Sequence, residues 1–355
     1  MDKMSGCVRK RIVIHLGSPK TGSTALQLSL LNNRDLLRSQ GFDYQFFEDD
    51  AEDWSIKRGL TGGSIWNPIY PNIDGHFEVG DLQFEMVNKV LQITLKQLEV
   101  YDTVILSNEF LFLLASSPLF GKLISDFSLK NEVEIEMVMY LRSPFDFLLS
   151  WYSESVKRGF TVSKFPAYLE NKEHILDTVY TALPAMLQVA KLFDIPFNLH
   201  VTRGRNYNVV ENFYTNLGVE HQKMIPSQKS NQSLNIFEMD FFRGVHTVSR
   251  ELGLIFCYER TDVHLASLYK LAKRKPDKLK MTEFALGILR EKLSKVELEL
   301  ENVHPELVHL DYDIEGRFEV CSEGELDDEV SNSVFEIGVM VARSYKAGYL
   351  RTRLR

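Results

Sequence analysis

Short apolar runs alternate along the chain with longer segments whose apolar residues recur at helical spacing. The short runs lie at residues 12–16, 103–106, 135–141 and 197–201, and they are typical of strands that a sheet buries on both faces. Helical segments are predicted at residues 25–31, 34–40, 84–100, 183–193 and 209–217, the last of them closed by Gly218. Strands that alternate with helices predict an α/β fold with a central parallel sheet flanked by helices.

Two regions depart from this alternation. Residues 42–80 are rich in aromatic, glycine and acidic residues and carry several turn signals, so an irregular insert is predicted there. Long irregular segments inside compact domains more often have a function than not. The alternative is a surface segment that folds around a small aromatic core of its own. Residues 236–355 are mostly amphipathic and include predicted helices at 282–299 and 331–347. We therefore expect a core at residues 1–235 and a helical C-terminal region at 236–355, packed on the same domain.

The first predicted strand ends in a short loop between two glycines. Gly17 follows the strand, and Gly22 precedes a helix that opens with Ser23. Glycines allow tight turns, loop N–H groups can point inward, and the helix N-terminus favours an anion, so this pattern predicts a phosphate-binding loop. It is not a Walker A sequence, because Ser23 occupies the position of the Walker lysine, and Lys20 lies inside the loop after Pro19.

A second motif follows the strand predicted at residues 135–141. Arg142 ends that strand, Ser143 is a good N-cap, and Pro144 suits the first turn of a helix. Ser150 lies on that helix, so the arginine and the serine hydroxyl can converge on one anion. The alternative is an arginine paired with a nearby carboxylate and a serine bonded to its own helix.

Together the two motifs resemble those of sulfotransferases that use 3'-phosphoadenosine 5'-phosphosulfate (PAPS), chiefly the bacterial carbohydrate type. The run from Pro19 to Thr24 resembles the 5'-phosphosulfate loop of that family, and Arg142 with Ser150 resembles its 3'-phosphate site. The resemblance implies a P-loop-type three-layer α/β fold and release of adenosine 3',5'-bisphosphate (PAP). It implies cofactor contacts from Ser18, Pro19, Lys20, Thr21, Gly22, Ser23, Thr24, Arg142, Ser150, Lys229, Asn231 and Ser233. For Ser233, a helix N-cap is an equally good interpretation.

The chemistry implied by the resemblance is in-line transfer of a sulfuryl group to an acceptor hydroxyl. Lys20 is the candidate for stabilising charge on the leaving phosphate oxygen, and no metal is expected. A base must accept the hydroxyl proton. Glu109, directly after the strand at 103–106, is the first candidate and His15 the second. The other candidates are His76, Asp43 and Glu48.

The composition of the chain limits the classes of partner and the cellular compartment that we expect. A net charge of −8 and a pI near 5.7 argue against a nucleic-acid-binding protein. Cys7, Cys257 and Cys321 lack metal-ligand spacing and are typical of reduced thiols. Neither a transmembrane run nor a signal peptide is recognisable, so a cytoplasmic enzyme is expected. Its acceptor is expected to be a carbohydrate or glycolipid hydroxyl, with residues 42–80 forming part of the acceptor wall.

Two other functions are compatible with the same motifs. One is a P-loop nucleotide kinase or hydrolase, which the missing Gly-Lys-Ser/Thr sequence and the missing magnesium aspartate disfavour. The other is a non-catalytic protein that binds PAPS or PAP, which the presence of both Lys20 and Glu109 disfavours.

Overall fold

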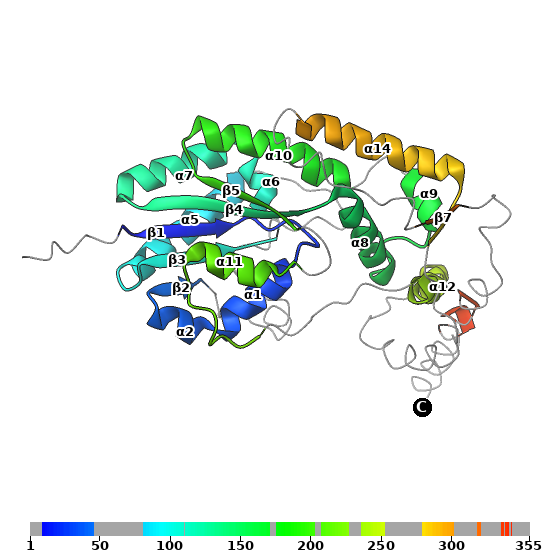
Figure 1. The fold of residues 1–355 in the computed structure, drawn as a ribbon, viewed down its shortest axis with the longest axis horizontal. Helices are drawn as coiled ribbons and strands as arrows, with labels where there is room; N and C mark the ends of the chain where they lie inside the picture. The colour runs from blue at the N-terminus through cyan, green and yellow to red at the C-terminus, as the bar shows by residue number, and fades with distance from the viewer. Residues whose placement is uncertain are drawn as a thin grey trace, which may run out of the picture. The chain divides into compact units, whose positions relative to one another are not determined.

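Figure 1 shows the computed structural model, which describes most of the chain. The chain divides into two compact units. The described residues are 9–45, 81–109, 111–170, 175–202, 207–226, 236–252, 279–301, 318–320, 335–336, 338–340 and 342. Unit 1 comprises Met1–Ser143, Leu176–Ser230 and Glu299–Val308, and unit 2 comprises Pro144–Ile175, Asn231–Leu298 and His309–Arg355.

Unit 1 contains a sheet of five parallel strands in the order β2-β3-β1-β4-β5. The strands are β1 (Arg11–His15), β2 (Phe42–Tyr44), β3 (Thr103–Ser107), β4 (Glu134–Arg142) and β5 (Phe197–Thr202). All four predicted strands are present, and the predicted α/β fold with a central parallel sheet is confirmed. The register aligns Ile14 with Leu106 of β3 and with Met137 of β4, so the central strands are apolar and buried as expected.

Helices cover both faces of this sheet. They are α1 (Ser23–Asn32), α2 (Arg34–Ser39), α5 (Asp81–Leu98), α6 (Leu111–Ala115), α7 (Pro118–Asn131), α10 (Ile175–Leu192) and α11 (Val209–Leu217). One face carries α1 and α11, and α7 and α10 lie on the opposite face (Figure 1). Side chains alternate along β1, so Val13 joins a core cluster with Leu26 of α1 and Phe213 of α11. The layers thus form a three-layer α/β arrangement.

The predicted irregular insert at residues 42–80 begins with a strand, which corrects the prediction. Phe42–Tyr44 is the edge strand β2, paired in parallel with β3. Its acidic residue, Asp43, is fully buried because Arg34 Nε and Arg38 Nε both donate to Asp43 Oδ1, at 2.9 and 2.8 Å. Local composition does not reveal this strand, since its charge is neutralised by residues of the preceding helix. Residues 46–80 lie outside the described ranges.

Unit 2 contains helices and a small sheet. Its elements are α8 (Pro144–Lys157), α9 (Phe165–Glu170), α12 (Ile236–Leu252), β6 (Leu279–Met281), α14 (Glu283–Glu301) and β7 (Phe318–Val320). The helix predicted at residues 282–299 is α14, whereas most of the helix predicted at 331–347 lies outside the described ranges. Strands β6 and β7 pair in parallel and were not expected in a region predicted to be mostly helical. Across the described ranges, no helix has both the length and the apolarity needed to span a membrane.

Candidate functional site

The candidate site lies at the edge of the sheet where the parallel strands of unit 1 end. β1 ends at His15, β3 at Ser107 and β4 at Arg142. The glycine-bounded loop (residues 17–22) follows β1, and Asn108 and Glu109 follow β3. Ligands of open α/β sheets bind outside these carboxyl ends, so the loop and Glu109 occupy the expected edge.

The glycine-bounded loop has an unusual backbone. Gly17, Ser18, Lys20 and Gly22 all have positive φ angles, of 78°, 134°, 64° and 100°. A positive φ is uncommon for residues other than glycine, and each such residue stores on the order of 1–3 kcal/mol of strain. Surrounding contacts therefore hold Ser18 and Lys20 in place. Loops in which left-handed residues occur among right-handed ones can turn successive N–H groups toward an anion.

Hydroxyl groups of the loop bond back to the loop itself. Thr21 Oγ1 donates to Ser18 O at 2.8 Å, and Ser23 Oγ donates to the same oxygen at 3.1 Å. The helical ladder of α1 starts with Leu26 N donating to Gly22 O at 3.0 Å, so the N–H groups of Ser23 and Thr24 precede it. The Thr21 and Ser23 hydroxyls must therefore rotate before either can donate to an anion.

Close packing holds the loop against the end of β3. A Cβ atom on Gly17 would lie 2.5 Å from Glu109 Cα, so only glycine fits there. The Asn108 N–H donates to His15 O at 3.2 Å, which joins the ends of β1 and β3. The contact places the Glu109 backbone directly against the first residue of the loop, and the Glu109 residue is half-buried.

His15, the second candidate base, is fully buried beneath the loop. Its Nδ1 lies 2.7 Å from Ser107 Oγ, which also accepts a hydrogen bond from Gln27 Nε2 at 3.1 Å. Ser107 Oγ thus connects His15 to Gln27 in a buried chain of hydrogen bonds. His15 Nε2 is buried and has no hydrogen-bond partner in the described part of the chain.

The surroundings of His15 are aromatic. Its ring lies 5.9 Å from the ring of Tyr140 and 6.0 Å from that of Phe213, measured between centroids. Burial lowers the pKa of His15 to about 3. A weakly basic imidazole enclosed by aromatic rings is poorly suited to accept a proton from an incoming hydroxyl. His15 is therefore the less suitable of the two candidate bases.

Of the three remaining candidate bases, only Asp43 lies in the described part of the chain. Asp43 is occupied by its two arginine partners and is fully buried. Glu48 and His76 lie outside the described residues.

Arg142 ends β4 with its backbone held on two sides. Tyr180 OH donates to Arg142 O at 2.6 Å, and Thr202 Oγ1 donates to Leu141 O at 3.0 Å. Within the described ranges, the Arg142 side chain takes part in no ion pair. Ser150 lies buried on α8, in unit 2, so the two members of the second motif belong to different units. Lys229, Asn231 and Ser233 lie outside the described residues.

Sequence reasoning missed the residues that support this site. Gln27 and Ser107 form the hydrogen-bonded connection to His15, and Tyr140 lies against its ring. No local pattern marks them, because their roles arise only when α1, β3 and β4 are brought together.

No protein-family model matches the chain, and no curated protein sequence is similar to it. In the described residues, no three histidine, cysteine, aspartate or glutamate side chains gather in a way that could hold a metal ion.

Proposed function

We propose that this protein is a PAPS-dependent sulfotransferase with a P-loop-type fold. The observation that carries the proposal is the glycine-bounded loop, which joins a buried parallel strand to a helix N-terminus and packs against Glu109. The N–H groups of a glycine-bounded loop and the N-terminus of α1 would suit the negative charge of a 5'-phosphosulfate. The residues present thus fit the cofactor, which would supply the sulfuryl group and leave as PAP.

Lys20 is proposed to stabilise the leaving group. As the sulfuryl group leaves, negative charge develops on the phosphate oxygen, and an ammonium group there is the most direct electrostatic help. Lys20 lies at the tip of the loop and is half-buried. Its positive φ supports a role for this particular backbone position, since strained conformations of this kind cluster at functional sites.

Glu109 is proposed to accept the proton of the acceptor hydroxyl. Glu109 follows the carboxyl end of β3, and its backbone contacts Gly17, the first residue of the loop that would hold the transferred group. General-base catalysis of this kind typically contributes about 10²–10⁴-fold. A carbohydrate or glycolipid hydroxyl is the proposed acceptor, on the strength of the resemblance described above.

Arg142 is proposed to bind the 3'-phosphate of the cofactor. It ends the strand next to β1, and its guanidinium can form charge-assisted hydrogen bonds with a phosphate. Arg142 would thereby distinguish PAPS and PAP from adenosine 5'-phosphosulfate, which lacks the 3'-phosphate.

Calorimetric titration with PAP in the absence of magnesium, beside ATP with magnesium, tests the cofactor. We expect saturable PAP binding without a metal. Binding of ATP with magnesium and none of PAP would instead identify a P-loop kinase or hydrolase. PAP binding without sulfuryl transfer to any of a panel of sugar and glycolipid acceptors would indicate a non-catalytic binding protein.

Variants assign the roles of the residues. Arg142→Ala should weaken PAP at least tenfold and leave adenosine 5'-phosphosulfate affinity within about twofold, because hydrogen bonds to charged groups contribute about 1.5–3 kcal/mol. Arg9→Ala, at an exposed arginine that precedes β1, is the control. Lys20→Ala and Glu109→Gln should lower turnover and retain PAP affinity. Equal loss of both nucleotides in Arg142→Ala would refute the 3'-phosphate assignment.

A further inference from the structure

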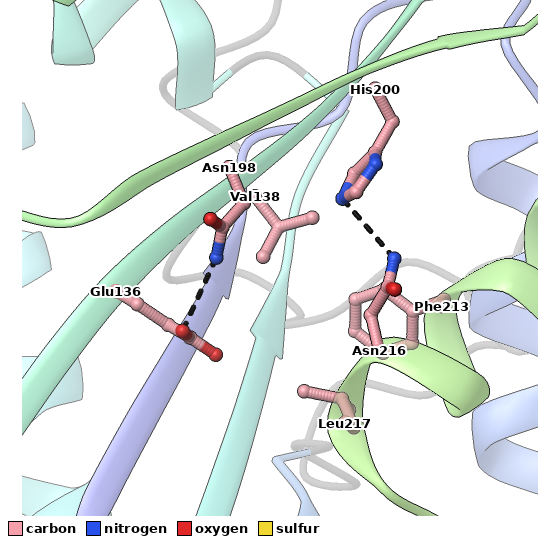
Figure 2. Close-up of a pocket in the computed structure, with 7 residues that line it drawn as sticks. All are labelled: Glu136, Val138, Asn198, His200, Phe213, Asn216 and Leu217. Carbon is pink, nitrogen blue, oxygen red and sulfur yellow. Dashed lines mark hydrogen bonds between the residues drawn. The ribbon is translucent and has the colours of Figure 1, made fainter.

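A pocket lies in unit 1 between strands β4 and β5 and helix α11, and neither the loop nor Arg142 lines it (Figure 2). Its volume is about 220 Å³. The apolar part of its lining consists of Val138, Phe213 and Leu217, all of them buried in the protein core. Drug-sized ligands occupy pockets of about 300–1,000 Å³, so this one suits a single small ring.

One polar side of the pocket is built from α11 and β5. Asn216 Nδ2 donates to Asn212 Oδ1 at 2.9 Å and approaches His200 Nε2 at 3.3 Å (Figure 2 shows the second contact). Both hydrogens of the Asn216 amide are thereby used, and His200 Nε2 is the acceptor. The imidazole proton therefore resides on Nδ1. The Asn216 carbonyl oxygen and the His200 Nδ1–H group take part in no other side-chain hydrogen bond in the described part of the chain.

The other polar side is built from the first halves of β4 and β5. Asn198 Nδ2 donates to Glu136 Oε2 at 3.3 Å (Figure 2). Glu136 Oε1 lies 3.7 Å from Arg11 Nη1, a distance at which the carboxylate keeps lone pairs for another donor. The Asn198 carbonyl oxygen accepts from no side chain in the described part of the chain.

The charged and polar groups that line the pocket disfavour an anionic ligand. Among the described residues that line it there is no lysine or arginine, and its one ionised group is the Glu136 carboxylate. Burial lowers the pKa of His200, which also stacks on Tyr140 at 5.1 Å between ring centroids, so its imidazole is neutral at pH 7. A phosphate or sulfate would meet a carboxylate and amide oxygens and is disfavoured.

We propose that this pocket binds a small uncharged polyhydroxylated ligand, a single sugar unit. Each sugar hydroxyl both donates and accepts, which matches a wall of amide oxygens, a carboxylate and one imidazole N–H. The apolar lining suits the C–H face of a sugar ring. Val138 precedes Arg142 by four residues on β4, about 13 Å along the strand, so the pocket does not include the proposed 3'-phosphate contact. The inference does not rest on the proposed function.

Saturation-transfer NMR and calorimetry with D-glucose, D-galactose and N-acetyl-D-glucosamine test the proposal on the full chain without nucleotide. We expect at least one of these sugars to bind, and Asn216→Ala and Asn198→Ala each to weaken it about threefold to tenfold, as expected for one hydrogen bond. Asn88→Ala, at an exposed asparagine of α5, is the matched control and should leave the affinity unchanged.

A bulky substitution provides a second, independent readout. Asn198→Trp replaces an exposed residue, so we expect the fold to survive while the new side chain fills the pocket and abolishes sugar binding. Sugar binding that survives Asn198→Trp would overturn the assignment to this pocket. Binding of glucosamine or inorganic phosphate, with none of the neutral sugars, would overturn the ligand class. Absence of binding by all three neutral sugars at tens of millimolar would overturn the proposal itself.

Discussion

Gly17 illustrates how a single residue constrains the candidate site. Its φ of 78° alone disfavours any other residue, and a Cβ atom there would lie 2.5 Å from Glu109 Cα. Gly218, which ends α11, has nearly the same φ, 73°, but nothing lies within 4 Å of its Cβ position. A comparison of substitutions at the two glycines therefore distinguishes the cost of backbone strain from the cost of steric overlap.

Substitution of these two glycines by alanine should have unequal effects. We expect Gly218→Ala to cost about 1 kcal/mol of unfolding free energy, from the left-handed backbone alone. Gly17→Ala should cost at least about 3 kcal/mol, because the backbone strain is joined by an overlap that only movement of the β3 end can relieve. Urea denaturation of both variants measures the difference. Equal costs would show that the loop is not packed tightly against Glu109.

His15 should make stability sensitive to acid. Burial lowers the pKa of His15 from 6.5 to about 3, so the unfolded chain takes up this proton at a higher pH than the folded chain. The stabilisation is fully present above about pH 6.5 and is lost as pH falls towards 3, at up to about 1.4 kcal/mol per pH unit. His15→Asn should unfold with a shallower pH dependence in urea between pH 6.5 and 4. Identical slopes would contradict a buried neutral imidazole.

At the scale of elements, three side chains of α12 bind the end of α8 and the segment after it. Arg243 Nε donates to Val162 O at 2.9 Å, His246 Nε2 to Lys157 O at 3.2 Å, and Arg250 to Gly159 O at 2.7 Å. Positions 243, 246 and 250 share one face of a helix. Basic side chains near the last carbonyls of a helix complement its dipole, so α12 stabilises the point at which α8 ends.

Loss of Arg243 should be costly. Arg243 Nη1 also pairs with Asp240 Oδ1 at 2.6 Å, and both side chains are at most 10% exposed. We expect Arg243→Met to destabilise the protein by about 3–5 kcal/mol, because a buried carboxylate loses its guanidinium partner. The double variant Arg243→Met/Asp240→Leu should recover at least half of that loss.

An exposed ion pair provides the control. Lys122 and Asp126 of α7 are both more than 60% exposed, so Lys122→Met should cost less than about 1 kcal/mol. Thermal and urea unfolding measure all three variants. If Arg243→Met were as mild as Lys122→Met, the attachment of α12 to the end of α8 would contribute little to stability.

There is a physical reason why the central strands were predicted from the sequence and three other strands were missed. The central strands are continuous apolar runs, so their local sequence alone predicts that both of their faces are buried. β2 was missed because it is an edge strand of three residues that includes Asp43, whose burial depends on Arg34 and Arg38. Strands β6 and β7 were missed because each has three residues and needs a partner that is distant in the chain.

At the scale of the whole molecule, the proposed cofactor should protect unit 1. PAP at about 100 times its dissociation constant would add about 2.7 kcal/mol of stability to the state that binds it. Hydrogen exchange should therefore slow in peptides that cover residues 11–26 and 134–142, which contain the loop and Arg142, and stay unchanged in α14. Protection confined to α14 and α12 would place the nucleotide elsewhere.

Local sequence determined the parallel strands, the glycine-bounded loop and the helix that follows it, since apolar runs and glycine conformation act over a few residues. Tertiary structure alone decided the strand order, the contact of Glu109 with Gly17 and the burial of His15 between Ser107, Tyr140 and Phe213. It also created the pocket between β5 and α11. These contacts join residues far apart in the chain, and they depend on the packing of the whole sheet and its helices, which no local pattern encodes.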